Sequence, residues 1–422
     1  MMPHRQDAVR AVADAIADRL ASPSTVRGLH LPQGWWPQSL AYGATGIALL
    51  HIERARTGLA PWRYVHDWLA CAAGGEILTG SDSHLFYGAP ALAFAVHAAS
   101  DLQGHYARAR DELHRHIAAT TRRSLDRAHT RMDHGRLVTL AEFDVIRGLA
   151  GIGAYLLRHA PHGELIRAVL EYLVRLTEPV KDGGDLLPGW WTDLDPAGRK
   201  SEAFEGGHGN NGVAHGICGP LALLSLALRD GVVVNGHIHA IQRICVWLDE
   251  WRQDGKAGPW WPYWVTRTEL REGYQGKSGP LRPSWCYGTA GLARAQQLTS
   301  LATGDLTRQR MAESALVRAF TDPGQLAAIT DPSLCHGYAG LLHIACRAAT
   351  DAVTPDLAAC LPRLLGMIIE DGIDADRVAA SLLLRPNDPG LLEGAAGIAL
   401  ALHSAHSGIP PVSGWDSCLL IS

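Results

Sequence analysis

The sequence predicts an all-α protein in which seven helix pairs form a double-layered α/α toroid, or barrel, with a Gly-x-x-Gly turn in each pair. Three observations carry this prediction. A short glycine motif recurs seven times along the 422 residues. An apolar run long enough for a helix follows each copy, and amphipathic stretches with helical spacing lie between the copies. The sequence has no long run with the two-residue period of a β-strand.

The repeated motif is a pair of glycines three positions apart, and successive leading glycines are separated by 45 to 72 residues. The first copy is AYGATGIALL (41–50) and the last is LEGAAGIALA (392–401). The leading glycines are Gly43, Gly88, Gly148, Gly216, Gly288, Gly337 and Gly394. The second copy has Ala91 in place of the second glycine. Internal repetition of this kind indicates a repeat architecture, so we expect one domain over residues 1–422.

The two kinds of helical stretch predict two layers. A run that is apolar all round, as after each glycine pair, predicts a buried inner helix. Residues 1–21, 162–177 and 305–320 carry apolar residues at helical spacing between charged ones, which predicts outer helices. The glycines would permit unusual backbone angles in the turns and close approach of the inner helices. Segment 254–285, rich in Trp, Pro and Gly, predicts a long structured loop or hairpin.

Composition excludes several classes of protein. The chain is 47% hydrophobic, which allows a large core, and its net charge of −4 gives no electrostatic case for binding nucleic acid. No stretch approaches 18 uninterrupted apolar residues, so we expect no membrane span. The N-terminal stretch lacks the apolar core of a secretion signal. Eight sparse cysteines favour reduced thiols, and with them a cytoplasmic protein.

The residue before each leading glycine is polar or carries a polar tip, although the run that follows is apolar. These residues are Tyr42, Tyr87, Arg147, His215, Tyr287, His336 and Glu393. One position further back lie Cys286 and Cys335. Equivalent positions of a closed repeat converge on its axis, so we expect these side chains to share one cavity mouth.

Cys286, Cys335 and His336 together predict a zinc site with two thiolate ligands, one imidazole ligand and one open position. Their spacing alone is a weak signal, and their common register in the repeat strengthens it. The alternative is that the cysteines are small residues packed between inner helices. We assign that packing role to Cys71, Cys218, Cys245, Cys346 and Cys360, and we expect His51, His343 and His403 to be packed or surface histidines.

Several motifs resemble those of the lanthionine cyclases, the LanC-type enzymes of lanthipeptide biosynthesis. They are FDVIRGLAG (143–151), NNGVAHGICGP (210–220), WCYGTAG (285–291), CHGYAG (335–340) and GWDSCLLI (414–421). The resemblance covers nearly the whole chain and implies a double α-toroid of seven helix pairs. The length is similar to that of a free-standing, class I cyclase.

The resemblance also implies the site. One zinc ion would be held by Cys286, Cys335 and His336. His215 and Asp144 would act near the zinc, while Arg282 and Tyr287 would line the site. The family substrate is a precursor peptide with a leader and dehydroalanine or dehydrobutyrine residues, to which cysteine thiols add to form thioether rings.

The residue types suit that chemistry. Two thiolates and a neutral imidazole leave a Zn²⁺ site formally neutral, so a further bound thiolate should stay nucleophilic. His215 would protonate the α-carbon of the enolate, although a zinc-bound water or another group is also open. Asp144 would orient His215, and Arg282 would steady the enolate oxygen. The alternatives are that Asp144 caps a helix and that Arg282 pairs with a loop carboxylate.

The resemblance implies a dehydratase and a transporter as partners, with peripheral membrane association through such a complex. Some family members carry an inserted β-rich domain thought to hold the peptide. Interval 101–142 is charged and predicts mostly helix, so that domain is expected to be reduced or absent. Trp190, Trp191 and the run PWWPYW (259–264) are candidates for peptide contact, with local packing as the alternative.

Three other functions remain open at this point. A LanC-like enzyme that adds glutathione or another small thiol to a dehydrated peptide would use the same zinc site. A zinc prenyltransferase also activates a peptide thiol in an α/α toroid, but the motifs argue against it. A non-catalytic scaffold of a biosynthetic complex would not need the zinc ligands or His215.

Overall fold

The computed structural model describes residues 3–26, 35–100, 104–256, 258–274, 276, 279–369, 372, 374–384 and 389–422. A few residues of the predicted segments, such as 101–103 and 257, lie outside these ranges. The chain forms two compact units. Unit 1 comprises Met1–Ile117 and Ile329–Asp416, and unit 2 comprises Ala118–Ala328 and Ser417–Ser422.

A buried helix begins one or two residues after each leading glycine, as predicted. In unit 1 these inner helices are α3 (Ala44–Arg56), α5 (Ala89–Ala99), α16 (Tyr338–Asp351) and α19 (Ala395–Ser407). In unit 2 they are α8 (Leu149–His159), α10 (Cys218–Arg229) and α13 (Thr289–Thr303). Nine of the twelve residues of α10 are buried, which explains the apolar run that encodes it.

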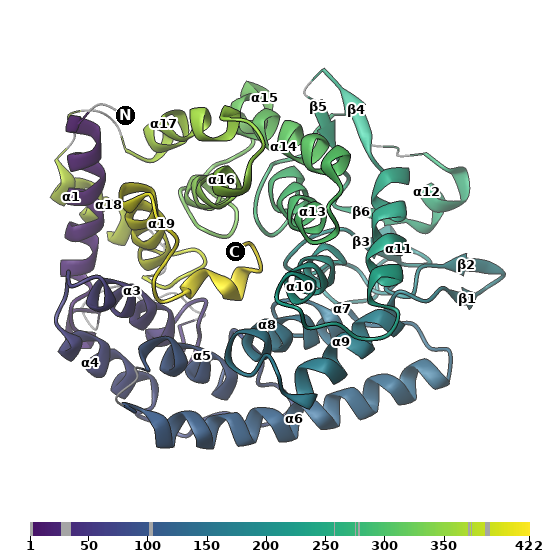
Figure 1. Cartoon of the computed structure of the whole chain (residues 1–422), viewed down its shortest axis with the longest axis horizontal. Helices are drawn as coiled ribbons and strands as arrows, with labels where there is room; N and C mark the ends of the chain where they lie inside the picture. The colour runs from purple at the N-terminus through teal and green to yellow at the C-terminus, as the bar shows by residue number, and fades with distance from the viewer. Residues whose placement is uncertain are drawn as a thin grey trace. The chain divides into compact units, whose positions relative to one another are not determined.

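The amphipathic stretches form the second set of helices (Figure 1). They are α1 (Pro3–Arg19), α4 (Trp62–Ala72), α6 (Ala107–Asp133), α9 (Glu164–Leu176), α11 (His237–Glu250), α14 (Leu306–Thr321), α17 (Asp356–Ile368) and α18 (Ala375–Leu384). Each of α4, α9, α11, α14 and α17 packs against the inner helix that precedes it in the chain. Short helical segments complete the set: α2 (Pro23–Val26), α7 (Leu140–Phe143), α12 (Arg267–Glu272), α15 (Pro323–Ala327), and the 3₁₀ turns Glu202–Phe204 and Trp415–Leu419.

Backbone hydrogen bonds join successive glycine turns within unit 1. The N–H of Cys335 donates to the carbonyl of Leu392 over 2.7 Å, and the N–H of Leu392 donates to Ala41 over 3.1 Å. The N–H of Leu40 continues the series to the carbonyl of Phe86 over 3.0 Å. The last turn of the sequence therefore lies beside the first.

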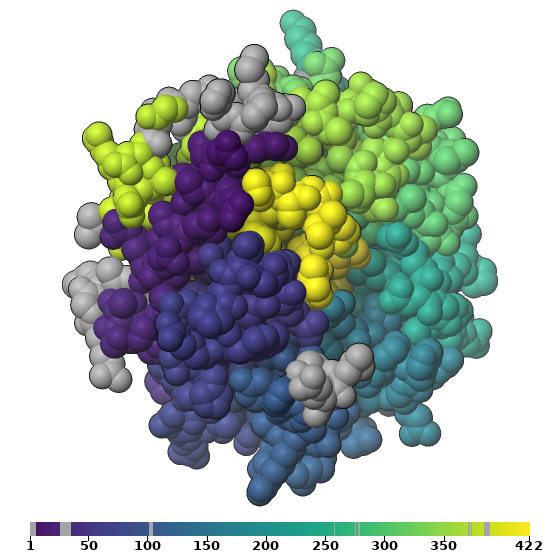
Figure 2. Space-filling view, turned by 60° about the vertical axis from the view of Figure 1, so that its left-hand side comes forward, coloured from purple at the N-terminus to yellow at the C-terminus, as the bar shows by residue number. Residues whose placement is uncertain are grey.

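The helices next to these turns show the same adjacency of the two chain ends in unit 1. Helix α1 packs against α19, and α19 packs against α3. Figure 2 shows the purple N-terminal segment beside the yellow C-terminal segment.

Unit 2 repeats the arrangement of turns. The N–H of Val145 donates to the carbonyl of Ala214 over 3.0 Å, and the N–H of Ala214 donates to the carbonyl of Cys286 over 3.3 Å. In both units the bonded atoms lie two or three residues before a leading glycine. Positions that are equivalent when the glycine motifs are aligned in the sequence are thus the positions at which neighbouring turns hydrogen-bond.

The glycines are required mainly for close approach. A Cβ atom on Gly291 would lie 2.2 Å from the carbonyl oxygen of Trp285, and one on Gly340 would lie 2.1 Å from that of Leu334. Unusual backbone angles, which we also predicted, are found only at two of the leading glycines, Gly88 (φ 79°) and Gly288 (φ 101°). The second glycine of a pair therefore packs against the loop of its own turn.

Strands are short and confined to unit 2 among the described residues. They form three antiparallel two-stranded sheets: β1 (Val180–Asp182) with β2 (Asp185–Leu187), β3 (His208–Asn210) with β6 (Trp264–Thr266), and β4 (Gln253–Gly255) with β5 (Gly258–Trp260). The predicted hairpin in 254–285 is present as β4 and β5, followed by β6 and α12. The described part of interval 101–142 forms α6 and α7 without a strand, as expected.

The tryptophan cluster packs inside unit 2. Trp190, Trp191, Trp260 and Trp261 are each at most 5% exposed. The indole of Trp191 donates to the carbonyl of Gly206, and the indole of Trp261 donates to the carbonyl of Leu248. The hypothesis that these four residues contact a peptide is therefore wrong, and local packing explains them.

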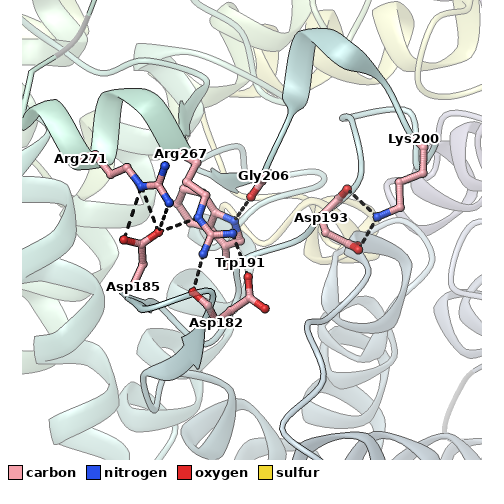
Figure 3. Close-up of polar contacts among 8 residues, drawn as sticks. All are labelled: Asp182, Asp185, Trp191, Asp193, Lys200, Gly206, Arg267 and Arg271. Carbon is pink, nitrogen blue, oxygen red and sulfur yellow. Dashed lines mark hydrogen bonds and ion pairs between the residues drawn. The ribbon is translucent and has the colours of Figure 1, made fainter.

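Polar contacts beside this cluster join the β1–β2 hairpin to α12 (Figure 3). Arg267 pairs with Asp182 and Asp185 over 2.8 Å each, and Arg271 pairs with Asp185 over 2.9 Å. The side chain of Arg267 is 13% exposed, so these ion pairs join the β1–β2 hairpin to α12 in a partly buried network.

No helix among the described residues is long and apolar enough to cross a membrane.

Candidate functional site

Cys286 lies in the turn before α13, and backbone hydrogen bonds hold it there. The carbonyl of Cys286 accepts from the N–H groups of Val213 and Ala214, over 3.1 and 3.3 Å. The hydroxyl of Ser284 lies 3.5 Å from the Cys286 Sγ. Cys286 is buried and is not in a disulfide. These contacts fix the thiol next to the loop that carries His215.

His215 and Asp144 form a hydrogen-bonded pair, with 2.7 Å between His215 Nδ1 and Asp144 Oδ2. The carboxylate is 2% exposed and the imidazole is 35% exposed. Asp144 Oδ1 accepts from the backbone N–H groups of Arg147 and Gly148, over 2.6 and 2.8 Å. Asp144 thus supports the turn before α8, whose N-cap residue is Gly148 and has no side-chain cap, so the helix-capping alternative is not found. Its contact with His215 is the one that the predicted orienting role requires.

Tyr287 is held from two sides. Its hydroxyl accepts from Asn210 Nδ2 over 3.1 Å, and its ring lies 5.3 Å from that of Tyr263. Asn210 Nδ2 also lies 3.2 Å from His208 Nε2, so that nitrogen accepts and His208 Nδ1 donates to a backbone carbonyl. Burial lowers the pKa of His208 to about 4, which keeps this acceptor unprotonated near neutral pH. The rings of His215 and Tyr287 are 6.2 Å apart.

Arg282 lies at the start of the same turn. Its carbonyl accepts from the Tyr263 hydroxyl over 2.9 Å. The Nε atom of Arg282 is buried and has no hydrogen-bond partner among the described residues. Burial is the main reason that the pKa of Tyr263 rises to about 12, and the nearby Arg282 charge acts against that rise. At this Nε atom, the loop ion pair considered as the alternative role of Arg282 is not found among the described residues.

Cys335 and His336 lie in the turn before α16, in unit 1. The backbone bond from Cys335 to Leu392 fixes the turn, and His336 Nε2 lies 3.3 Å from Asp331 Oδ2. Asp331 Oδ1 also accepts from the N–H of Ser333 over 2.8 Å. In the same unit, the Tyr42 hydroxyl donates to Glu393 over 3.2 Å, so two further residues that precede leading glycines are in contact.

The donors on these turns fit zinc chemically. Cys286, Cys335 and His336 are metal-capable residues, the first buried and the other two half-buried. Both cysteines are outside any disulfide. Thiolates and an imidazole are the ligands that zinc prefers in proteins. A carboxylate beside one imidazole nitrogen, as Asp331 is beside His336, is the usual support for a metal-binding histidine.

The remaining cysteines and histidines are mostly structural. Burial raises the pKa of the Cys245 thiol to about 11 and that of Cys346 to about 12. Cys218 and Cys360 are also buried, whereas Cys71 and Cys346 are half-buried as whole residues. Of the two alternatives given for His51, His343 and His403, packed or at the surface, the structure shows the first, because all three are buried.

Sequence reasoning missed three residues that support the site. They are Asn210, which holds Tyr287, Asp331, which contacts His336, and Ser284, which contacts Cys286. Asn210 lies in the quoted motif NNGVAHGICGP, and Asp331 lies four residues before Cys335. For Asp331 the available signal was an acidic residue close to two proposed ligands, and for Asn210 it was an amide in the motif that carries His215.

Comparison with known proteins gives consistent results. The family described as lanthionine synthetase C-like protein matches residues 34–420. The nisin biosynthesis protein NisC of Lactococcus lactis subsp. lactis is 26% identical over 276 residues, which are 64% of this chain and 62% of that protein. A solved structure described as a nisin cyclase is 22% identical, with a TM-score of 0.76 over 98% of this chain and 97% of that one.

The match to the solved structure shows the fold and confirms the predicted all-α, α/α-toroid class. The match to the family covers all seven glycine turns, which carry the candidate site. The chain therefore belongs to the lanthionine synthetase C-like family.

Proposed function

We propose that this protein is a zinc-dependent lanthionine cyclase that acts on a dehydrated precursor peptide. The observation that carries the proposal is the hydrogen bond between His215 and the buried Asp144 carboxylate. His215 lies on a loop whose backbone N–H groups donate to the carbonyl of Cys286. An acid–base pair beside a candidate zinc thiolate is the arrangement that thiol addition to an alkene needs. Membership of the family and the relative named for nisin biosynthesis support the same activity.

Cys286, Cys335 and His336 are the proposed ligands of one zinc ion per chain. A zinc ion held by these residues would lower the pKa of a substrate thiol bound to it, so that the thiol would react as a thiolate. For the three ligands to serve together, the two compact units must act as one catalytic domain, which we also propose.

His215 is the proposed proton carrier. The thiol adds across the carbon–carbon double bond of dehydroalanine or dehydrobutyrine: a sulfur–Cβ bond forms, the π bond breaks, and the thiol proton is replaced by a proton delivered to Cα. Because His215 Nδ1 is bonded to Asp144, Nε2 is the nitrogen that exchanges this proton. No oxidant is needed, and the peptide keeps its mass.

Asp144 is the proposed positioning residue for His215. Its bonds to two backbone N–H groups hold the carboxylate, and its other oxygen fixes the imidazole tautomer.

Arg282 and Tyr287 are proposed to bind the reacting amide. The buried Nε–H of Arg282 has no partner among the described residues, and an enolate oxygen would accept from it. Tyr287 is fixed by Asn210 and presents its ring near His215. A dehydratase that supplies the alkene and a transporter that removes the product are the proposed partners.

Ring closure can be tested on a dehydrated precursor peptide with purified protein. Each ring consumes one thiol without changing the peptide mass, so the reaction is read by alkylating the remaining thiols before mass spectrometry. We expect fewer alkylated thiols with wild-type protein that contains zinc, and no change with a zinc-free preparation. Equal alkylation with and without the zinc-containing protein would overturn the proposal.

The same experiment separates the competing functions. Added glutathione that appears in the product as a mass increase would favour the enzyme that joins small thiols to peptides. A scaffold would bind its partners equally well after Cys286→Ala, which removes a proposed zinc ligand. Cyclisation that depends on that cysteine excludes the scaffold.

A further inference from the structure

A cavity of about 670 Å³ with two aromatic rings in its lining lies within unit 1. It is bounded by the loop before α3, the loop after α4 and the turn before α5. Its aromatic residues are Trp36, which is 45% exposed, and Tyr87, which directly precedes a leading glycine. The two ring centroids are 6.1 Å apart. An indole so exposed beside a second ring offers an aromatic face to a ligand.

The lining of this cavity carries negative charge. Glu76 lines it and is exposed, and no lysine or arginine is found among the lining residues that the structure describes. The face of an aromatic ring also attracts positive charge, most strongly for an indole. A carboxylate next to two aromatic rings is therefore complementary to a cation and unfavourable for an anion.

A buried side chain fixes the loop that carries Glu76. Gln38 is 2% exposed, and its Nε2 donates to the carbonyl of Glu76 over 2.7 Å. Its Oε1 accepts from the N–H of Leu78 over 3.0 Å. The carbonyl of Leu78 accepts from the N–H of Ala89 over 2.8 Å, which joins the loop to the turn of Tyr87. The carboxylate is thus presented by an ordered frame, which lowers the entropic cost of binding.

The aromatic residues are held in the same way. The N–H of Tyr87 donates to the carbonyl of His84 over 2.8 Å, and the N–H of His84 donates back over 2.9 Å. Their rings are stacked, with centroids 5.8 Å apart. The carbonyl of Trp36 accepts from the N–H of Ser39 over 2.8 Å. Both rings of the cavity therefore project from hydrogen-bonded turns.

A row of equivalent side chains in unit 1 leads from the cavity to a proposed zinc ligand. The backbone bonds between successive turns place Tyr87, Tyr42, Glu393 and His336 in this order along the row. Side chains at these positions reach each other, since the Tyr42 hydroxyl donates to Glu393 over 3.2 Å. A peptide whose cysteine approaches His336 can therefore extend along the row to the cavity.

We propose that this cavity binds a lysine or arginine side chain of the precursor peptide. The proposal rests on the proposed function, because it takes the substrate to be a peptide. The cation lies over the Trp36 indole and pairs with Glu76, beside Tyr87. It anchors the peptide at the end of the row that leads to His336, so the cavity acts in substrate binding and takes no part in bond formation.

The test titrates unlabelled peptides into protein that contains 5-fluorotryptophan and follows the Trp36 resonance by fluorine NMR. Trp36→Phe assigns that resonance. The peptides are rich in glycine and serine and contain no cysteine, so binding is independent of zinc and ring closure. They differ at one position, which is lysine, norleucine or glutamate. We expect a saturable shift with the lysine peptide, at least about fivefold tighter than with norleucine, and weaker binding of glutamate.

The resonance of Trp62 is the internal control, because Trp62 is 44% exposed and does not line the cavity. It should not shift. Equal affinities of the lysine and norleucine peptides, or equal shifts of the Trp36 and Trp62 resonances, would overturn the proposal.

Two charge variants locate the carboxylate. Glu76→Gln should weaken binding of the lysine peptide by about threefold. Asp67→Asn is the matched control, since Asp67 is an exposed residue of α4 that changes the net charge equally and does not line the cavity. An equal loss in both variants would reduce the effect to overall charge and overturn the role of Glu76.

Ring closure gives an independent measurement. With a dehydrated peptide that contains lysine, Trp36→Leu should raise KM by about fivefold and change kcat much less, because the indole binds substrate and does not react. Trp62→Leu is the control and should leave both constants unchanged. A fall in kcat without a change in KM would contradict a role in binding.

These experiments separate the proposal from the proposed function. Protein that closes rings but shows no preference for the lysine peptide would overturn the cation site alone. Protein that binds the lysine peptide at Trp36 but closes no ring would overturn the cyclase assignment alone. A concentration-dependent dimer in sedimentation that Trp36→Leu abolishes would assign the cavity to a second copy of the chain, which also overturns the proposal.

Discussion

His215 Nδ1 and Asp144 Oδ2 are 2.7 Å apart, although the two residues are 71 positions apart in the sequence. The same carboxylate accepts from two N–H groups in the turn before α8. The imidazole is therefore held by a group that cannot rotate without breaking the turn. This arrangement makes the tautomer of His215 a property of the fold.

Replacement of these two residues separates catalysis from folding. We expect His215→Ala to slow ring closure by about 100-fold or more, with zinc retained. Asp144→Asn should slow it by a similar order because the amide favours the wrong tautomer, while its oxygen still accepts from the turn. Asp144→Ala should in addition lower the free energy of unfolding by about 1–2 kcal/mol, because the turn loses its acceptor. Thiol alkylation and urea unfolding measure the two effects, and normal cyclisation by His215→Ala would remove His215 from the mechanism.

The zinc site is tested by metal content. We expect about one zinc per chain by mass spectrometry of the digested protein, and its loss in Cys286→Ala, Cys335→Ala and His336→Ala. Cys346→Ala is the control, because burial raises the pKa of that thiol to about 12 and it is not a proposed ligand. Zinc retained in Cys286→Ala, or lost equally in the control, would contradict the ligand set.

Adding a single methyl group tests whether the turn before α13 requires glycine. Gly291→Ala places a Cβ 2.2 Å from the carbonyl oxygen of Trp285, the residue before Cys286. We expect the free energy of unfolding to fall by about 1–3 kcal/mol and zinc binding to weaken, because the turn must move. Gly74→Ala is the control, since its nearest atoms lie at 3.4 Å and its change should stay within about 0.5 kcal/mol. Equal stability of the two variants in urea would show that the turn tolerates a side chain.

The stability of the protein should fall in mild acid. Burial lowers the pKa of His51 to about 4 in the folded protein, whereas the unfolded chain protonates this histidine near its ordinary pKa of 6.5. Between these values only the unfolded state binds the proton, so stability is lost as the pH falls from about 6.5 to about 4. This one group should account for about 3 kcal/mol.

His51→Gln isolates that contribution. A glutamine amide can still donate to the carbonyl of Leu20, which His51 Nε2 contacts over 2.8 Å, but it does not titrate. We expect the difference in unfolding free energy between pH 7 and pH 4 to shrink in this variant. An unchanged difference would show that His51 is protonated in the folded state.

Local patterns in the sequence accounted for the helices and turns. The apolar run after Gly216 predicted α10, and the amphipathic run 305–320 predicted α14, because helix spacing is a property of neighbouring residues. The repeat also placed Tyr42 and Glu393 at equivalent positions, and they are in contact. The burial of Trp190 and Trp261 was not readable in this way, since a tryptophan-rich loop has the same sequence whether it packs inward or outward.

The sequence by itself determined the family, the order of helix pairs and the residues with chemistry to offer: Cys286, Cys335, His336 and His215. Only the tertiary structure decided how these residues are supported. It joined His215 to Asp144, and it placed Asn210 on Tyr287. Such hydrogen bonds connect groups from distant turns, and their geometry depends on how the helices pack. Periodicity and spacing describe a residue's own segment, and they carry no information about which distant group will meet it.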